Sequence, residues 1–275
     1  MKAITPRVHQ RANCALTIAG SDSGGGAGIQ ADLKTFAAHG VHGLSAIAAL
    51  TAQNTRGVSA VSVPPAAFLR AQIDACFEDF RIGAVKIGML ANSRVINAVA
   101  DALEAWQPKL IVLDPVMVAS SGASLLERSA LNALRTRLIP MATLLTPNIP
   151  EAELLLGHPI ADDEAAEAAL IELLELGAAA VLLKGGHLKG KEMTDRLDDG
   201  RQLHEFVHAR LALQGHGTGC TLASAVAANL CLGLRLAEAC GAATDYVHGA
   251  LASAYRPGRG KVAVLDHFWQ RCKND

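Results

Sequence analysis

The feature that most constrains this chain is a regular alternation between short apolar runs and longer stretches with helical spacing. The apolar runs are predicted to be β-strands, and they cover residues 15–19, 44–50, 58–63, 84–87, 110–113, 144–145 and 179–183. Helical spacing of apolar residues occurs at residues 28–39, 64–80, 93–106, 164–176, 218–231 and 236–255. This alternation predicts a single α/β domain built on a doubly wound, mostly parallel sheet flanked by helices. One exception is a hairpin, predicted where residues 195–197 and 202–207 flank Asp198-Asp199-Gly200.

The composition fits this fold class and narrows the functions. Hydrophobic residues make up 51% of the 275 residues but aromatic residues only 4%, as expected for aliphatic strands covered by helices. The formal net charge of −1 gives no sign of a nucleic-acid surface. The 6 cysteines include no C-x-x-C pair, so neither a zinc site nor a redox dithiol is indicated, and free thiols are expected.

Two segments bear on where the protein works. Residues 1–13 are polar and lack the apolar core of a signal peptide, so we expect an N-terminal extension on a cytoplasmic protein. Residues 211–234 carry no charged residue apart from His216, and their length approaches that of a membrane span. Glycines and Asn229 interrupt this segment, so a loop that leads into a buried helix is predicted, with no membrane partner.

Small and polar residues gather directly after the predicted strands, where open α/β sheets bind their ligands. The run from Gly20 to Gly28 exposes backbone amides, although a flexible turn is the alternative. Asp114 follows a buried strand and could bind a cation. Asn148 and Glu151 could supply further oxygen ligands, or they could cap the helix that begins there.

The strongest local signal is Gly217-Thr218-Gly219-Cys220, at the start of the least polar predicted helix. Backbone amides at such a helix start can form an anion hole for a phosphoryl group in transfer. The helix dipole is expected to lower the pKa of the Cys220 thiol, so that a thiolate could accept a proton from a substrate hydroxyl. A covalent nucleophile and a buried structural thiol are the alternatives for Cys220.

Several motifs taken in order resemble the bacterial hydroxymethylpyrimidine/phosphomethylpyrimidine kinases of thiamine synthesis, which belong to the ribokinase-like superfamily. The resemblance runs from about residue 14 to residue 268, and it rests on ALTIAGSD at 15–22, GIQADLKT at 28–35, AQNT at 52–55, KIGML at 86–90, TPNIPE at 146–151, KGGH at 184–187 and HGTGCT at 216–221. Cysteine after Gly-Thr-Gly is rather specific, because most ribokinase-like enzymes, including many pyridoxal kinases, carry Asp there.

The resemblance implies a kinase that transfers the γ-phosphate of Mg-ATP to 4-amino-5-hydroxymethyl-2-methylpyrimidine and then to its monophosphate. It implies a homodimer of one domain at residues 14–268, followed by a C-terminal tail at 269–275. By similarity, Cys220 is the base and Gly217, Thr218 and Gly219 belong to the anion hole, while the other expected site residues are Gln53, Asp32, Gly20, Ala27, Met89 and Val116 for the pyrimidine, Asn148 and Lys184 for ATP, and Asp114 and Glu151 for Mg²⁺.

Two alternatives stay open. A pyridoxal or pyridoxine kinase handles a similar flat ring with a hydroxymethyl group, and dual activity is compatible with the sequence. A non-catalytic ligand-binding protein of the same fold is the alternative from another class, although the presence of Asp114, Glu151 and Cys220 argues against it. The chain departs from the family at Asp22-Ser23-Gly24-Gly25, commonly Asp-Pro-Ser-Gly, and at Gly258-Arg259-Gly260, commonly Gly-His-Gly.

Overall fold

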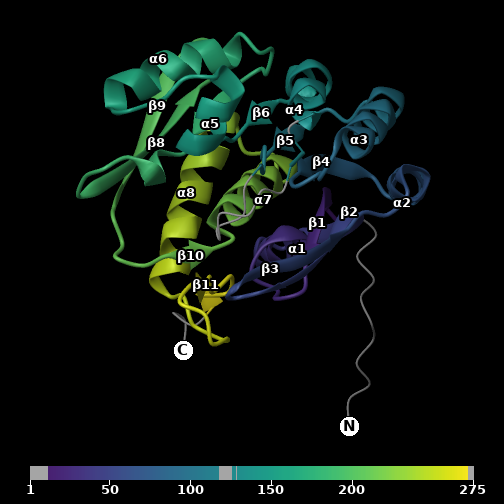
Figure 1. The fold of residues 1–275 in the computed structure, drawn as a ribbon, viewed down its shortest axis with the longest axis horizontal. Helices are drawn as coiled ribbons and strands as arrows, with labels where there is room; N and C mark the ends of the chain where they lie inside the picture. Colours follow the sequence, from purple (N-terminus) through teal and green to yellow (C-terminus); the bar gives the residue numbers. More distant parts are fainter. Residues whose placement is uncertain (1–11, 118–125, 128, 272–275) are drawn as a thin grey trace, which may run out of the picture.

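A computed structural model describes residues 12–117, 126–127 and 129–271, and in these residues a single large sheet lies between two layers of helices (Figure 1). The strand order is β3-β2-β1-β4-β5-β6-β7-β8-β9. The central strands from β2 to β7 are parallel, while β3, β8 and β9 add antiparallel edges. The strand bounds are β1 Cys14–Asp22, β2 His42–Asn54, β3 Gly57–Ser62, β4 Ile82–Ile87, β5 Ile111–Leu113, β6 Leu144–Leu145, β7 Val181–Leu183, β8 Glu192–Asp198 and β9 Leu203–Ala209.

Helices cover both faces of the sheet and bury a separate apolar cluster on each. One cluster joins the sheet to α2, α3, α4, α5 and α6, and the other joins it to α1, α7 and α8. The helix bounds are α1 Gly28–Ala38, α2 Ala66–Asp79, α3 Ser93–Trp106, α4 Ala130–Ala133, α5 Ile149–Leu156, α6 Asp163–Leu174, α7 Thr218–Cys231 and α8 Leu236–Ala252. The predicted doubly wound α/β fold is therefore confirmed.

Two parts of the fold were not predicted from the sequence. A π-turn at Leu134–Leu138 and a 3₁₀ turn at Ile139–Met141 continue the path of α4, so residues 130–141 are helical. A small parallel sheet pairs β10 (Gly215–His216) with β11 (Ala263–Val264). Each of its strands has only two residues, too few to produce a periodic pattern. This pairing brings the C-terminal segment to the start of α7.

The apolar segment near residue 220 is an internal helix. Every residue of α7 from Thr221 to Leu230 is buried, which explains why the segment lacks charge. None of the described helices has the length and apolar character to cross a membrane. The described cysteines are all free thiols. Trp269, assigned from the sequence to the tail after residue 268, packs against the α8 side of the core, so ordered packing continues beyond that boundary.

Because β1, β4, β5, β6 and β7 are parallel, their carboxyl ends lie along the same edge of the sheet. The residues that follow these strands therefore face a common space, and α7 begins beside it.

Candidate active site

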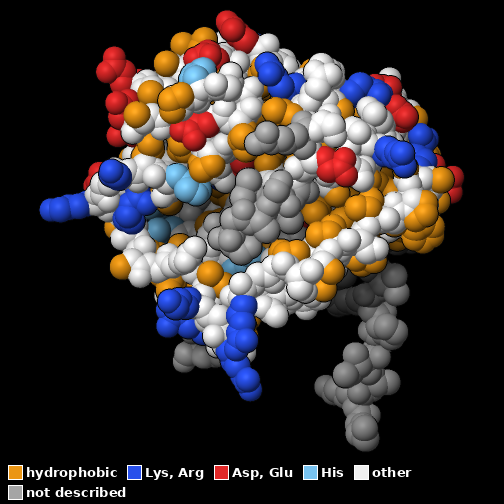
Figure 2. All heavy atoms as spheres, in the orientation of Figure 1, with side chains coloured by type: hydrophobic (Ala, Val, Ile, Leu, Met, Phe, Trp, Pro, Cys, Tyr) orange, Lys and Arg blue, Asp and Glu red, His pale blue; other side chains and the backbone are white. Residues whose placement is uncertain are grey.

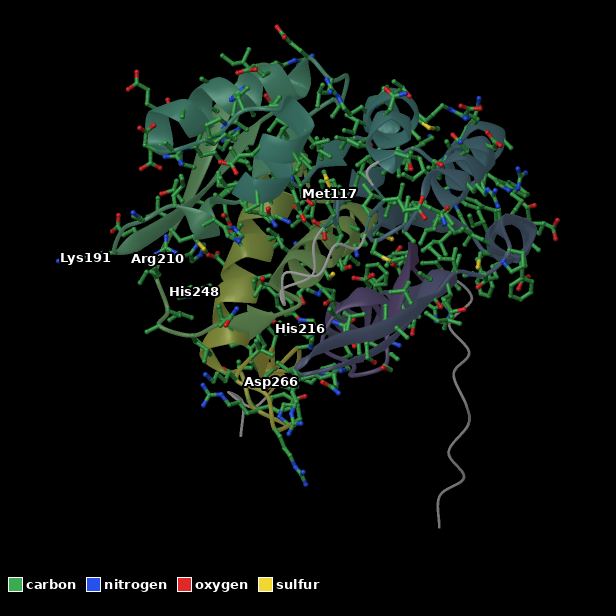
Figure 3. The ribbon with its side chains drawn as sticks, in the orientation of Figure 1. Met117, Lys191, Arg210, His216, His248 and Asp266 are labelled. Atoms are coloured by element: carbon green, nitrogen blue, oxygen red, sulfur yellow. The ribbon has the colours of Figure 1, made fainter. Side chains whose placement is uncertain are left out.

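A pocket of about 430 Å³ lies at the carboxyl edge of the sheet, next to the start of α7. It brings together nearly all the residues predicted for the site, namely Gly20, Ala27, Gln53, Met89, Asp114, Val116, Asn148, Glu151, Lys184, Gly217, Thr218, Gly219 and Cys220. His216, the last residue of β10, lies at this pocket near the start of the C-terminal segment (Figure 3), and its side chain reaches Gln53 of β2. The pocket thus has a phosphoryl end at α7 and an acceptor end at β1 and β2.

The phosphoryl end begins with Gly217, which occupies the N-cap position of α7 in a left-handed conformation with φ of 84°. A Cβ on this residue would lie 2.0 Å from the Gly26 carbonyl oxygen, so both the backbone conformation and the available space require glycine. No side chain caps the helix. The first amides of α7 have no partner within the helix, and their residues line the pocket, as an anion hole requires.

Two buried carboxylates and one lysine lie directly beside this helix start. Lys184 Nζ is 2.8 Å from Asp114 Oδ1 and 3.7 Å from Glu151 Oε2. Lys184 and Asp114 also approach α7 closely. A Cβ on Gly219, in the first turn of α7, would lie 3.1 Å from Lys184 Nζ and 3.7 Å from Asp114 Oδ2. Burial raises the pKa of Glu151 to about 7 against the opposing charge of Lys184, and Asp114 adds to the rise. Positive and negative charge are therefore concentrated where phosphates would meet the helix.

The same carboxylates are suited to Mg²⁺. The contacts that Asp114 makes with Thr146 and Lys184 both fall on Oδ1, and those of Glu151 fall on Oε2. The other oxygen of each carboxylate therefore makes no hydrogen bond or ion pair with a described residue. Mg²⁺ typically binds one or two protein carboxylates and takes its other ligands from water and phosphate oxygens. Two carboxylates with one available oxygen each fit a metal that takes its remaining ligands from nucleotide phosphates and water.

Asn148 and Glu151 also form the helix cap that was the alternative interpretation. The Asn148 side chain accepts from the Glu151 amide at 2.9 Å, and Glu151 Oε2 accepts from the Asn148 amide at 2.9 Å. This capping box fixes both side chains at the start of α5. The helix cap and a role at the active site are therefore compatible, because the capping box holds Glu151 next to Lys184 at the pocket.

The predicted low pKa of Cys220 is wrong for this structure. Burial raises the pKa of the thiol to about 11, although the Lys86 ammonium acts in the opposite direction. The helix dipole falls off within the first turn and is worth a few tenths to one kcal/mol at exposed sites, which does not offset the loss of water around a thiolate. Cys220 nevertheless borders the pocket, as predicted.

Asp32 does not reach the pyrimidine pocket, contrary to the prediction. Its side chain is fully buried, and among the described residues it does not line the pocket. Lys86 Nζ is 3.0 Å from each carboxylate oxygen, and the hydroxyls of Thr17 and Ser224 donate at 2.6 and 2.7 Å. Asp32 lies on the inward face of α1, one turn beyond the glycine-rich loop, so its carboxylate points beneath the pocket rather than into it.

Lys86 is the group that this carboxylate holds. Burial alone would lower the pKa of Lys86, but Asp32 outweighs that effect and holds the pKa above its ordinary value. Lys86 is therefore a buried cation, and it lines the floor of the pocket near Cys220. A lysine inside an apolar strand was the signal in the sequence that could have revealed this ion pair.

The acceptor end is built on close packing around Gly20. A Cβ on Gly20 would lie 2.9 Å from Met89 Sδ, so glycine lets the methionine side chain lie against β1. Met89 is 7% exposed and lines the pocket together with Val116 and Ala27. These side chains give one end of the pocket an apolar wall suited to a flat ring.

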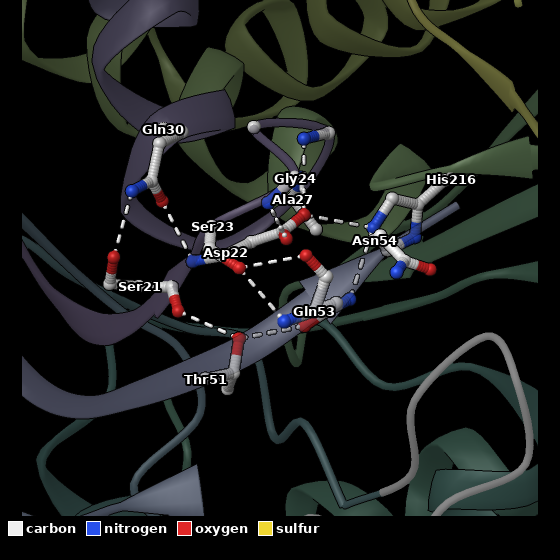
Figure 4. Close-up of polar contacts among 12 residues, drawn as sticks. Ser21, Asp22, Ser23, Gly24, Ala27, Gln30, Thr51, Gln53, Asn54 and His216 are labelled. Carbon is white, nitrogen blue, oxygen red and sulfur yellow. Dashed lines mark hydrogen bonds and ion pairs between the residues drawn. The ribbon is translucent and has the colours of Figure 1, made fainter. Parts of the chain in front are cut away.

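A polar network that the sequence did not reveal completes this end (Figure 4). Asp22 Oδ2 accepts from the Gly26 and Ala27 amides at 3.0 and 2.9 Å, and it lies 3.0 Å from His216 Nε2. His216 Nε2 also lies 3.2 Å from Gln53 Nε2. The Asp22 carboxylate can only accept and the Gln53 Nε2 amide can only donate, so a His216 Nε2–H that donates to Asp22 cannot also accept from Gln53. The Gln53 amide is therefore left to hydrogen-bond a ligand.

An open parallel sheet with an anion hole on the helix beside its carboxyl edge is the architecture of the ribokinase-like small-molecule kinases. The structural neighbours agree. The pyridoxal kinase of Bacillus subtilis, solved with ADP, is 34% identical with a TM-score of 0.88, covering 95% of this chain and 99% of its own. The phosphomethylpyrimidine kinase of Clostridium difficile is 43% identical with a TM-score of 0.77, covering 86% and 97%.

Comparison with known sequences identifies the family within this class of kinases. The family model for phosphomethylpyrimidine kinase matches residues 22–265. The hydroxymethylpyrimidine/phosphomethylpyrimidine kinase of Rhizobium meliloti is 51% identical over 262 residues, which cover 93% of this chain and 98% of the relative. This chain therefore belongs to the phosphomethylpyrimidine kinase family, and it is a kinase.

Proposed function

We propose that this protein transfers the γ-phosphate of ATP, with Mg²⁺, to the hydroxymethyl group of 4-amino-5-hydroxymethyl-2-methylpyrimidine and then to the resulting monophosphate. The observation that carries the proposal is one continuous pocket with an anion hole and a charged cluster at one end and a ring-sized apolar wall at the other. Such a pocket can hold a flat acceptor in line with a nucleotide phosphate. The names of the relatives agree with this choice of substrate.

The residues of the chain have distinct tasks in this mechanism. Mg²⁺ would be held by the free oxygens of Asp114 and Glu151 and would neutralise charge on the ATP phosphates. Lys184 and Asn148 face the same phosphates, and the amides of Thr218, Gly219 and Cys220 stabilise the phosphoryl oxygens in transfer. Gln53, Met89 and Val116 orient the ring so that its hydroxyl points to α7. Catalysis then rests mainly on positioning and electrostatics, as is usual for phosphoryl transfer.

Cys220 is proposed as the proton acceptor. A thiol with a pKa of about 11 is protonated at neutral pH, so cations beside it must stabilise the thiolate before it can act as a base. Lys86 already acts in that direction. Phosphoryl transfer tolerates this arrangement, because a loose transition state requires little removal of the hydroxyl proton before the new bond forms.

The homodimer is proposed on the basis of one surface. Large apolar side chains are exposed on β2, β3 and α2, with Leu50 48%, Val61 46% and Phe68 61% exposed. Figure 2 shows hydrophobic side chains gathered over these elements. A second copy of the chain would cover them, and the expected location of the assembly is the cytoplasm. Light scattering with Val61→Asp/Phe68→Asp beside the parent protein tests this, since the double variant should be a monomer.

The second candidate function is pyridoxal kinase, favoured by the likeness to the Bacillus subtilis enzyme at a TM-score of 0.88. One experiment separates the candidates: ADP release in the presence of Mg-ATP and hydroxymethylpyrimidine, its monophosphate or pyridoxal. The proposal predicts turnover with both pyrimidines. Turnover with pyridoxal alone would refute it and support the alternative, and no turnover with any acceptor would support a binding protein.

A further inference from the structure

A second pocket, of about 490 Å³, opens beside the acceptor end of the active site. Gln53, Gln214 and His216 line both pockets, so the two spaces share a wall. The rest of the second pocket comes from two short segments, residues 54–57 at the turn between β2 and β3 and residues 259–262 before β11. The proposed mechanism uses none of the residues from these two segments.

The two segments are joined in a specific way. The Gly260 amide donates to Thr55 Oγ1 at 3.0 Å, across 205 residues of sequence. A Cβ on Gly260 would lie 1.9 Å from the Thr55 carbonyl oxygen, and a Cβ on Gly258 would lie 2.4 Å from Thr55 Oγ1. Only glycine permits so close an approach at these positions, so the walls of the second pocket are held in a defined arrangement.

The described lining of the second pocket carries positive charges that no acidic lining residue balances. Arg56, Arg259 and Lys261 are exposed, and their side chains make no ion pair or hydrogen bond with any described residue. No acidic residue is among the described lining residues. By contrast, Arg137 is paired with Asp101 and Glu104. Figure 2 shows Lys and Arg side chains gathered on the lower part of the same face. Unpaired cations around a concave site attract anions more strongly than the same charges spread over a surface.

The nearest carboxylate in the network described above does not cancel this charge. Asp22 reaches His216, which belongs to the shared wall, but its oxygens already accept from the Gly24, Gly26 and Ala27 amides as well. Burial would raise the pKa of Asp22, but these hydrogen bonds outweigh it and lower the pKa. The Asp22 carboxylate is thus ionised but engaged by the loop amides and His216, and it makes no ion pair with Arg56, Arg259 or Lys261.

We propose that the second pocket first captures the phosphate group of the monophosphorylated acceptor, a phosphomonoester dianion, and then releases that acceptor past Gln53 into the active site, where its phosphate turns to α7. The inference rests on the proposed function, because only an enzyme with two successive acceptors meets both a neutral alcohol and its phosphate. A cationic pocket beside the acceptor end raises the local concentration of the second acceptor alone. Arg56, Arg259 and Lys261 therefore determine specificity for the second step and take no part in the first.

The test uses a pair of variants with the same change in net charge. Arg56→Gln/Arg259→Gln removes one cation from each segment of the second pocket. Arg81→Gln/Lys109→Gln removes two exposed cations that precede β4 and β5, at the opposite edge of the sheet. For each variant, KM and kcat are measured with the alcohol and with the monophosphate at saturating Mg-ATP. The pocket variant should raise KM for the monophosphate about tenfold and weaken its dependence on salt, because a focused field changes encounter by about 10–10³-fold.

The KM for the alcohol should change less than twofold in both variants, and the control should match the parent with both acceptors. Equal losses with the two acceptors would indicate a structural effect and overturn the proposal, as would no change with either. Inorganic phosphate is the probe for the phosphate group alone. It should compete with the monophosphate in the parent and lose this effect in the pocket variant; competition that persists in that variant would overturn the assignment.

A binding measurement separates this inference from the proposed function. Calorimetric titration of the monophosphate into ATP-free protein should give a dissociation constant about tenfold weaker for the pocket variant than for the control. This measurement needs no turnover. A parent protein that phosphorylates neither acceptor would refute the proposed function, whereas equal dissociation constants in the two variants would refute the second pocket.

Discussion

The two ends of the active-site pocket are built in different ways. At the phosphoryl end, neighbouring residues in the sequence act together: Gly217 to Cys220 are consecutive, and Asn148 and Glu151 are three residues apart in one helix cap. At the acceptor end, contacts join distant segments. Asp22 reaches His216 across 194 residues, and Gln53 reaches His216 across 163.

This difference separates chemistry from specificity. The phosphoryl end consists mainly of local motifs fixed to strand ends, and its long-range contacts, such as Lys184 to Asp114, join neighbouring parts of the sheet edge. It therefore forms as the sheet forms. The acceptor end depends on how separate loops meet, and it can change without disturbing the anion hole. Structural neighbours that act on pyridoxal and on phosphomethylpyrimidine are consistent with one phosphoryl end serving several acceptor ends.

The largest effect on turnover is expected at the phosphoryl end, from Cys220→Ala. If Cys220 is the proton acceptor, turnover should fall by about 10²-fold, the lower end of the usual contribution of a positioned base, because a loose transition state needs little proton removal. ATP affinity should hardly change, because the anion-hole amides belong to the backbone. Steady-state kinetics and calorimetric ATP binding measure the two quantities.

The control is Cys76→Ala, which changes a partly buried thiol on α2. It should leave turnover unchanged. Near-normal turnover of Cys220→Ala would remove the base role and leave Cys220 as a neighbour of the anion hole. Alkylation gives a second readout: with a pKa of about 11, the thiol should react slowly at pH 8 and faster as the pH rises.

The largest change in the free energy of unfolding is expected from the Lys86–Asp32 ion pair, which lies beneath both ends of the active-site pocket. Lys86 and Asp32 have side chains that are 0% exposed, and Asp32→Asn leaves a buried ammonium without its counter-charge. Removal of one partner from such a pair costs about 3–5 kcal/mol. Urea unfolding of Asp32→Asn should show a loss of this size.

The buried pair can also be compared with its own double variant and with an exposed ion pair. Asp32→Leu/Lys86→Met should be less destabilised than either single change, because no charge is left uncompensated. Arg70→Ala breaks a pair whose side chains are 36% and 29% exposed, and it should cost no more than about 1 kcal/mol. A double variant as unstable as the sum of its single changes would show that Lys86 and Asp32 act independently.

The difference between local motifs and contacts of distant segments also explains which features of the site could be predicted from the sequence. The strand ends, the anion hole and the Asn148–Glu151 cap follow from local patterns, and the structure places them together. Asp32 was misassigned because its role depends on Lys86, 54 residues away, and a helix pattern alone does not show which way its carboxylate points. The pKa of Cys220 was misjudged because burial outweighs the helix dipole, and burial depends on the assembled fold.

A smaller effect is expected at the acceptor end, from Gln53→Ala. Loss of one neutral hydrogen bond of about 0.5–1.5 kcal/mol should raise KM for the pyrimidine by about 2–13-fold, with kcat nearly unchanged. Gln72→Ala is the matched control. Gln72 accepts from the Ile47 amide at 2.9 Å, supports β2 from α2 and lies outside the pocket. A fall in kcat at constant KM would instead place Gln53 in the chemistry of the phosphoryl end.

The smallest effect is the pH dependence of stability that Asp22 contributes at the acceptor end. Burial raises the pKa of Asp22, but hydrogen bonds from His216, Gly24 and Ala27 outweigh it and hold the pKa below its ordinary value. The folded state therefore favours the carboxylate, which contributes stability above the ordinary pKa of about 3.9. This contribution is lost as the pH falls through the lowered pKa.

The parent should consequently exceed Asp22→Asn in free energy of unfolding at pH 6, and the difference should shrink at pH 3. His216→Gln should reduce the same difference, because His216 supplies one of the hydrogen bonds that lower the pKa of Asp22. Urea unfolding at the two pH values measures both. A difference between parent and Asp22→Asn that is equal at the two pH values would mean that the network stabilises the loop by shape and not by charge. The acceptor end would then resemble the phosphoryl end in being held mainly by backbone geometry.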